Sequence, residues 1–240
     1  MRIAMWSGPR NLSTAMMYCF GARTDCAVVD EPFYGAYLKQ TGLVHPMGDE
    51  IMAQMETDPD AVVAQIMGSI PDGKPHFYQK HMCHHMIEGF DRNWVVECKN
   101  VFLLRHPARV VASYAVKREE PSLADLGFAQ QAEIFEQVVA IGQEPIVIDS
   151  YDIRQNPEGM IDALCRALDI PFAPEMLRWS AGGHPQDGIW ADHWYGAVHK
   201  STGFAGPEGE LPKVEGDLGR VVEEAMPYYD ALAAKKISVT

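Results

Sequence analysis

The feature that most constrains the fold is a strand–turn–helix pattern that occurs twice. In the first copy, an apolar run at residues 2–6 passes through a polar turn into a helical stretch at 12–22. In the second, an apolar run at 101–104 passes through a turn into a helical stretch from about 108 to 117. A helix that begins directly after a buried strand directs free N–H groups and its positive dipole end to one place, which favours anions. The two copies therefore predict an α/β fold with two anion sites.

The rest of the chain continues the alternation. Further strands are expected at 26–30, 76–80 and 145–149, and further helices at 49–70, 123–141, 157–168 and 217–236. Within 49–70, Asp58-Pro59 is expected to be a break and the start of a new helix. Strands that alternate with helices form a mainly parallel sheet with right-handed crossovers. We therefore expect an α/β fold of three layers, with a central, mainly parallel five-stranded sheet in a single domain over residues 1–240. Because ligands bind beyond the carboxyl ends of such strands, both anion sites should face one cleft.

Residues 180–215, which we call the lid segment, differ from this pattern. They are rich in glycine and proline and contain Trp190, Trp194 and Tyr195. We interpret them as a long, ordered, loop-rich lid over the site. A surface excursion packed by its own aromatic side chains is the alternative, because long loops of this length can be functional or merely compact.

Composition and charge exclude several classes of protein. The net charge of −13 disfavours broad nucleic-acid binding, which requires a basic face, so an anionic ligand needs a locally positive pocket. No apolar run approaches the ~20 residues of a membrane span, and the first residues do not resemble a signal peptide. The five cysteines are scattered without a CxxC pair, as in reduced proteins. We expect a cytoplasmic protein that binds neither nucleic acid nor membrane.

The first anion loop, residues 7–14 (Ser-Gly-Pro-Arg-Asn-Leu-Ser-Thr), contains the residue types that hold a phosphate-like group. Gly8 allows close approach of the backbone, Arg10 supplies a charged donor, and the hydroxyls of Ser13 and Thr14 add two more. No Gly-Lys pair precedes these hydroxyls, which argues against the GxxxxGK[ST] loop of nucleoside triphosphatases. An ordinary strand–turn–helix with a Ser/Thr cap is the alternative.

The second anion segment, residues 103–114, places Arg105 at a strand end and Pro107 at a helix start. Ser113 follows eight residues after Arg105, about two helical turns along. These two side chains can converge on one phosphate, with Arg109 as a further contact. A surface arginine paired with one of the many acidic residues is the alternative.

Together the two segments resemble the P-loop sulfotransferase superfamily. The 5′-phosphosulfate loop of that family reads PKSGTT or PRSGTT after the first strand, and residues 9–14 occupy its register with Asn11-Leu12 in place of Ser-Gly. The family's 3′-phosphate element, an Arg with a Ser eight positions on, matches Arg105 and Ser113. The DEPFY segment at 30–34 and the HKSTGF segment at 199–204 also resemble a small sulfotransferase-like subgroup.

The resemblance implies that the chain binds 3′-phosphoadenosine 5′-phosphosulfate (PAPS) as co-substrate. The donor-binding residues that it implies are Gly8, Pro9, Arg10, Asn11, Leu12, Ser13, Thr14, Arg105, Ser113 and Lys200. Lys200 is included because the HKSTGF segment corresponds to a C-terminal loop that covers the nucleotide in the family. The implied reaction moves a sulfuryl group to a hydroxyl or amine of a small-molecule acceptor.

Sulfuryl transfer requires in-line positioning, charge compensation at the leaving oxygen and a general base for the acceptor. Arg10 fits the second requirement, so no metal is expected. Two candidates for the base follow strands: Glu31 matches the carboxylate of carbohydrate- and tyrosine-type sulfotransferases, and His81 resembles the histidine of the cytosolic small-molecule branch. The acceptor pocket is expected to include the lid aromatics with Phe33, Tyr34 and Tyr37.

Several alternatives remain at this level. The dense set His81, Cys83, His84 and His85 invites a zinc interpretation, but it lacks a second group with ligand spacing. A P-loop small-molecule kinase would need a carboxylate for Mg²⁺ after residues 76–80, where the sequence has none. The Asn11-Leu12 departure leaves open a nucleotide-binding module without catalysis. The sequence fixes neither the acceptor nor the oligomeric state, a homodimer being among the states it allows.

Overall fold

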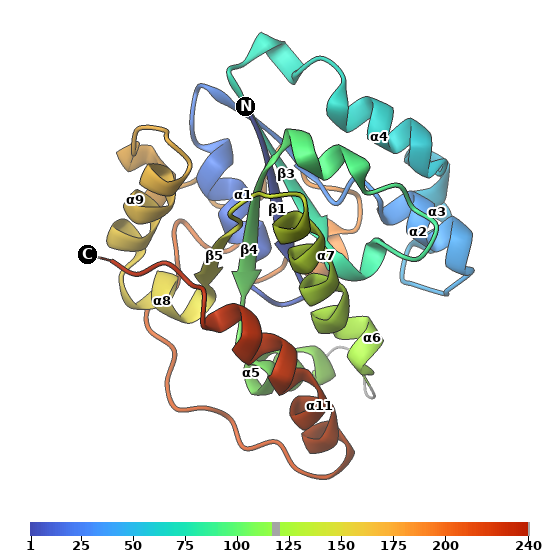
Figure 1. The fold of residues 1–240 in the computed structure, drawn as a ribbon, viewed down its shortest axis with the longest axis vertical. Coiled ribbons are helices and arrows are strands. Elements are labelled where there is room, and N and C mark those ends of the chain that lie inside the picture. The colour runs from blue at the N-terminus through green and yellow to red at the C-terminus, as the bar shows by residue number, and fades with distance from the viewer. Residues whose placement is uncertain (117–120, 240) are drawn as a thin grey trace.

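A five-stranded sheet forms the centre of the computed structural model, which describes residues 1–116 and 121–239 (Figure 1). The strands lie in the order β2-β3-β1-β4-β5, and each neighbouring pair is parallel. Their bounds are β1 Arg2–Ser7, β2 Cys26–Asp30, β3 His76–Met82, β4 Lys99–Leu104 and β5 Ile146–Asp149. All five predicted strands are confirmed, and the sheet is parallel throughout rather than mainly so.

The predicted helices are present with one unexpected division, and three further helices, at 34–41, 150–155 and 191–194, were not expected. The α-helices are α1 Ser13–Gly21, α2 Tyr34–Thr41, α3 Gly48–Gln54, α4 Pro59–Met67, α5 Pro107–Ala115, α6 Leu123–Leu126, α7 Phe128–Ala140, α8 Ser150–Gln155, α9 Pro157–Ala167, α10 Ala191–Trp194 and α11 Gly216–Ala233. Short 3-10 turns are η1 Pro71–Gly73, η2 Cys83–His85, η3 Asn93–Glu97 and η4 Pro174–Leu177. The last residue of the helix expected at 108–117 lies outside the described residues.

Local signals explain where the two long predicted helices divide. The side chain of Asp58 accepts a hydrogen bond from the N–H of Asp60, and Pro59 takes the first helical position, so α4 begins anew after α3. Gly127 adopts a φ of 72° and ends α6 before α7 begins. The break expected at Asp58-Pro59 within residues 49–70 is therefore confirmed, whereas the single helix expected at 123–141 is two helices.

The side chains of the strands alternate between two apolar layers. Ile3 and Met5 pack with α1 and α9 on one face of the sheet, whereas Ala4 and Trp6 pack with α4, α7 and α11 on the other. Figure 1 shows the same arrangement, with α7 in front of β4 and α1 behind the strands. The fold has three layers, as the alternation of elements predicts.

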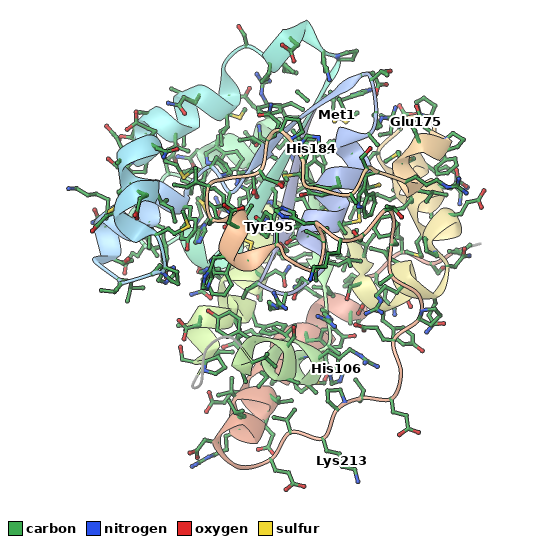
Figure 2. The ribbon with its side chains drawn as sticks, turned by 180° about the vertical axis from the view of Figure 1, so that it is seen from behind. Met1, His106, Glu175, His184, Tyr195 and Lys213 are labelled. Carbon is green, nitrogen blue, oxygen red and sulfur yellow. The ribbon has the colours of Figure 1, made fainter. Side chains whose placement is uncertain are left out.

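The lid segment has little regular structure. It contains α10 and one isolated bridge, between Arg178 just before it and Gly203, and then runs to α11. Figure 2 shows it crossing the sheet from His184 through Tyr195 and then descending to Lys213 beside α11. Within the two described stretches of the chain, no helix has the length and apolar character needed to cross a bilayer.

Candidate functional site

A cavity of about 330 Å³ opens at the carboxyl ends of the strands. Residues 9–15 of the first anion loop and α1 form one wall, and Arg105, Ser113 and Tyr114 form another. Glu31 and Lys80 line it from β2 and β3, and the lid segment closes it with residues from Trp190 to Ala205. The cleft that parallel α/β topology predicts is therefore present, and both anion segments face it.

The two anion segments touch each other directly. Arg10 Nε donates to the hydroxyl of Ser113 at 3.0 Å, and Arg105 donates to the carbonyl oxygen of Arg10 at 2.6 Å. Asn11 Nδ2 donates to the carbonyl oxygen of Leu103 at 3.2 Å and ties the loop to β4. Burial and the nearby Arg105 cation lower the pKa of Arg10. This repulsion between guanidinium groups is what an anionic ligand would relieve.

The first anion loop has an unusual backbone. Arg10 and Leu12 both adopt left-handed conformations, with φ of 62° and 72°. Such a conformation costs a residue with a Cβ roughly 1–2 kcal/mol, but alternation of this kind turns successive N–H groups into a concave anion site. Leu12 stands at the glycine position of the motif that the loop resembles, so the Asn11-Leu12 departure retains the backbone that a glycine would favour.

Two residues predicted to bind the donor lie elsewhere. A Cβ on Gly8 would be 2.3 Å from the carbonyl oxygen of Leu126, so this glycine permits packing against the end of α6 and not approach to a ligand. Lys200 is exposed and lines a separate hollow beside Trp179 and Phe204. Neither Gly8 nor Lys200, both expected to bind the donor, therefore lines the cavity.

A buried group of charges, Asp30, Glu31, Lys80 and Tyr195, lies at the cavity; we call it the carboxylate–lysine cluster. Lys80 Nζ donates to Asp30 at 2.8 Å, to Glu31 at 2.7 Å and to the Tyr195 hydroxyl at 2.5 Å. The Tyr195 hydroxyl in turn donates to Asp30 at 2.8 Å. The side chains of Lys80 and Asp30 are each 1% exposed, and that of Glu31 is 10% exposed. The lid is thus fastened to the strand ends through a hydroxyl.

Burial controls the protonation of this cluster. It raises the pKa of Glu31, and the neighbouring Asp30 raises it further, against the lowering effect of the Lys80 cation. Burial alone would lower the pKa of Lys80, but the two carboxylates outweigh it and raise that pKa overall. Lys80 is therefore held as a cation, and Glu31 is a stronger base than an exposed glutamate.

The backbone also fixes where Glu31 points. Its φ of 42° is left-handed, and its N–H donates to the carbonyl oxygen of Lys80 at 3.0 Å. A positive φ at a residue other than glycine is strained and needs support from its surroundings. Here the hydrogen bond and the Lys80 ion pair provide that support, so the carboxylate stays at the cavity.

His81, the other candidate for the base, lies on the opposite face of β3. Successive strand residues point to opposite faces, so Lys80 reaches the cavity while His81 stacks on Trp6 at 4.6 Å between ring centroids. His81 Nε2 lies 3.1 Å from Gln79 Oε1, and burial lowers the pKa of the histidine to about 3. The structure therefore does not place His81 where the predicted base is needed, because its ring is in the core and does not line the cavity.

Aromatic side chains form the wall beyond Glu31. Tyr34 stacks on His85 with a centroid distance of 4.7 Å and meets Trp190 edge-on at 5.1 Å. Burial and neighbouring histidines lower the pKa of His85 well below its usual value, so the ring is neutral. Tyr34 lines the cavity as expected. Phe33 and Tyr37 do not line the cavity. Phe33 packs into the core, and Tyr37 stacks on the ring of His85.

The suspected metal ligands do not form a centre. Within residues 1–116 and 121–239, no group of three or more His, Cys, Asp or Glu side chains has an arrangement suited to a metal ion. Cys83 is fully buried in the apolar core, and His84 and His85 lie against Tyr37. His81 and Cys83 therefore belong to the core, whereas His84 and His85 line the cavity.

Sequence reasoning missed four functional candidates: Lys80, Tyr195, Arg154 and Glu208. Lys80 was visible beside His81, but the choice between them required knowing which face of β3 meets the cavity. Tyr195 was noted only as a lid aromatic. Arg154 lies in α8 and Glu208 in the lid segment. Glu208 forms ion pairs with both Arg105 and Arg154, which no local sequence pattern indicates.

Comparison with known proteins identifies a family and a fold. The family model described as "Sulfotransferase domain" matches residues 1–236. Two Arabidopsis thaliana proteins named branched-chain-amino-acid aminotransferase-like protein 2 and protein 1 are each 37% identical over 96% of the chain. The chain spans 41% of the length of these relatives. The crystal structure of a sulfotransferase from Alicyclobacillus acidocaldarius has a TM-score of 0.52 at 13% identity, with 98% of this chain and 94% of that one covered, which shows a shared fold.

Proposed function

Because the chain belongs to the sulfotransferase domain family, we propose that it transfers a sulfuryl group from PAPS to a hydroxyl or amine of a small-molecule acceptor. One observation carries the proposal. A single cavity joins the first anion loop, Arg105 with Ser113, and the buried base Glu31. A donor with phosphate-like groups at both ends and an acceptor facing a base would each find suitable partners there.

In this proposal each end of the donor binds to one of the two anion segments. The 5′-phosphosulfate lies at residues 9–14, where Arg10, the hydroxyls of Ser13 and Thr14 and the concave backbone supply donors. The 3′-phosphate lies at Arg105 and Ser113. Arg10 already donates to Ser113, so the residues that would bind the two ends of the nucleotide contact each other. The reacting end is the one nearer to Glu31 in this assignment.

Sulfuryl transfer exchanges one bond to sulfur for another. The acceptor oxygen or nitrogen forms a bond to sulfur while the bond from sulfur to the 5′-phosphate oxygen breaks, and 3′,5′-bisphosphoadenosine leaves. Glu31 takes the proton of the acceptor, for which its raised pKa is suited. Arg10 and the loop N–H groups compensate the charge that develops on the leaving phosphate. Lys80 holds Glu31 in place as a positioning residue.

The wall of the cavity suggests the acceptor's body. Tyr34, Trp190 and Trp194 line the cavity together with the neutral ring of His85. Such a wall favours an apolar or aromatic molecule, because a charged acceptor would lose its hydration without a partner. We therefore propose a small acceptor with an apolar or aromatic body and one reactive hydroxyl or amine.

Strand-end charge disfavours the kinase alternative. A P-loop kinase places a Mg²⁺-binding carboxylate on a strand beside the first one. Here the two neighbours of β1, which are β3 and β4, present the cations Lys80 and Arg105 to the cavity. Mg²⁺-dependent turnover of ATP would restore that alternative.

The test is sulfuryl transfer itself. The purified chain is incubated with PAPS and a panel of phenols, alcohols and amines, and the sulfated product is detected by mass spectrometry. We expect transfer to at least one phenol or apolar alcohol, and a loss of about a hundred- to ten-thousandfold in Glu31→Gln, the range a general base contributes. Glu136→Gln, which changes an exposed glutamate of α7, is the matched control. Nucleotide binding without transfer to any acceptor would favour a non-catalytic module.

A further inference from the structure

Three arginines converge on one carboxylate beside the cavity. Arg105 and Arg154 lie 2.5 Å and 2.8 Å from Glu208 Oε1, and Arg109 lies 3.1 Å from Glu208 Oε2. They come from the turn after β4, from α8 and from α5, whereas Glu208 belongs to the lid segment. We call Arg105, Arg109 and Arg154 the arginine cluster. The side chain of Glu208 is only 2% exposed, so this carboxylate fills the cluster.

The charges of this group do not balance. Among the residues that the structure describes, Glu208 is the only carboxylate within ion-pair distance of the three arginines. Three positive charges and one negative charge leave an excess of two positive charges. A phosphate brings up to two negative charges and three acceptor oxygens, so it suits three guanidinium groups better than one carboxylate does.

The backbone around Glu208 is held by the same arginines. Arg154 Nε donates to the carbonyl oxygen of Gly206 at 2.8 Å, and Arg109 donates to that of Gly209 at 2.5 Å. Residues 206–210 therefore form a strap that is fastened almost wholly by arginine cluster contacts. A ligand that took those arginines would release the strap.

The strap borders the position proposed for the 3′-phosphate. Arg105 lines the cavity and uses one nitrogen for the carbonyl oxygen of Arg10 and the other for Glu208. The guanidinium group that is proposed to bind the 3′-phosphate is thus already paired. Its second partner is a carboxylate that supplies the same kind of charge-assisted hydrogen bond as a phosphate oxygen.

We propose that Glu208 is an internal substitute for the 3′-phosphate of the nucleotide. In the ligand-free chain it occupies the arginine cluster. On binding, the 3′-phosphate displaces it, and Arg109 and Arg154 become phosphate ligands together with Arg105. This proposal rests on the proposed function, because that function supplies the nucleotide. Its consequence is that the strap lowers the apparent affinity for nucleotides with a 3′-phosphate, the donor included, and leaves the affinity for nucleotides without one unchanged.

The test compares the wild type with Glu208→Gln, which removes the charge and keeps the shape. Both are titrated by calorimetry with 3′,5′-bisphosphoadenosine and with adenosine 5′-phosphate. If the cluster is free in about one molecule in ten, the variant binds the bisphosphate about tenfold more tightly and the monophosphate no better. Equal or weaker binding of the bisphosphate by the variant would overturn the proposal, since Glu208 would then only orient the arginines.

Two further variants serve as controls for this result. Glu210→Gln makes the same charge change at an exposed position of the strap and is expected to leave both affinities unchanged. Glu208→Asp retains the charge that the arginines need for folding but shortens the side chain. It is expected to raise the affinity for the bisphosphate by a smaller factor, so the proposal stays testable if Glu208→Gln does not fold.

Inorganic phosphate separates this proposal from the function on which it rests. If neither nucleotide binds any form of the chain, the proposed function fails. Millimolar phosphate should still raise the melting temperature of Glu208→Gln more than that of the wild type, and adding Arg154→Ala to the variant should remove the gain. An equal response of the wild type and Glu208→Gln would overturn the assignment of the arginine cluster as an anion site.

Discussion

The carboxylate–lysine cluster and the arginine cluster border the same cavity with opposite imbalances of charge. The first places two carboxylates around one cation, Lys80, and the second places three cations around one carboxylate, Glu208. Lys80 and Asp30 are held by adjacent strands, whereas Glu208 is carried by the lid segment. The difference indicates what each cluster lacks: a proton at Glu31 and an anion at Arg105.

The largest effect is expected when the single cation of the carboxylate–lysine cluster is removed. Lys80→Met leaves Asp30 and Glu31 buried without a counter-charge, and such a loss typically destabilises a protein by about 3–5 kcal/mol. Equilibrium unfolding in urea measures the change. Lys236→Met is the matched control, because Lys236 is exposed and pairs with the half-buried Asp152, so its loss should cost less than about 1 kcal/mol. Equal effects of the two changes would show that the Lys80 cluster is well solvated.

The pH dependence of transfer tests the base in the same cluster. Only ionised Glu31 accepts a proton, so the rate should fall about tenfold per pH unit below the pKa of that residue. Burial raises this pKa above the ordinary 4.5, so the acid limb of kcat/KM should lie above pH 4.5. Glu31→Asp should move the limb, whereas Glu136→Gln should leave it in place. A rate that stays constant down to pH 4.5 would contradict a role for Glu31 as base.

The first anion loop, which lies between the two clusters, offers a smaller test. At the left-handed φ of Leu12, glycine avoids a cost that alanine bears, so Leu12→Gly should be about 1 kcal/mol more stable than Leu12→Ala. Both lose the same packing of the leucine side chain. Thermal unfolding of the two variants gives the difference. If alanine proves the more stable of the two, the loop does not hold this backbone in solution.

The smallest effect is expected in the arginine cluster. Arg154→Met should lower the free energy of unfolding by about 1 kcal/mol or less, because Arg154 is 22% exposed and Glu208 keeps two other arginines. Urea unfolding beside Lys80→Met gives the comparison directly. A loss as large as that of Lys80→Met would mean that the lid is as integral to folding as the strand ends.

Much of the fold could be predicted because its signals are local. Apolar runs mark the strands, and Asp58-Pro59 and Gly127 mark where helices begin or end. The contact between Arg10 and Ser113 could also be anticipated, since parallel strand ends meet at one edge of the sheet.

The rest depended on three-dimensional relations that no local pattern carries. Whether Lys80 or His81 meets the cavity depends on which face of β3 the lid covers. Gly8 was assigned to a ligand because it belongs to the predicted first anion loop, yet a side chain there would meet Leu126 in a distant helix. Glu208 lies in a segment without periodicity, and its partners come from two separate parts of the chain.

The measurement that tests the central claim most directly is nucleotide selectivity. Wild type and Arg105→Ala are titrated by calorimetry with 3′,5′-bisphosphoadenosine and with adenosine 5′-phosphate. The account predicts that the wild type prefers the bisphosphate by about tenfold or more, since a charge-assisted phosphate contact is worth at least that factor, and that the variant loses the preference. No binding at high micromolar concentration, or a preference that survives Arg105→Ala, would contradict it.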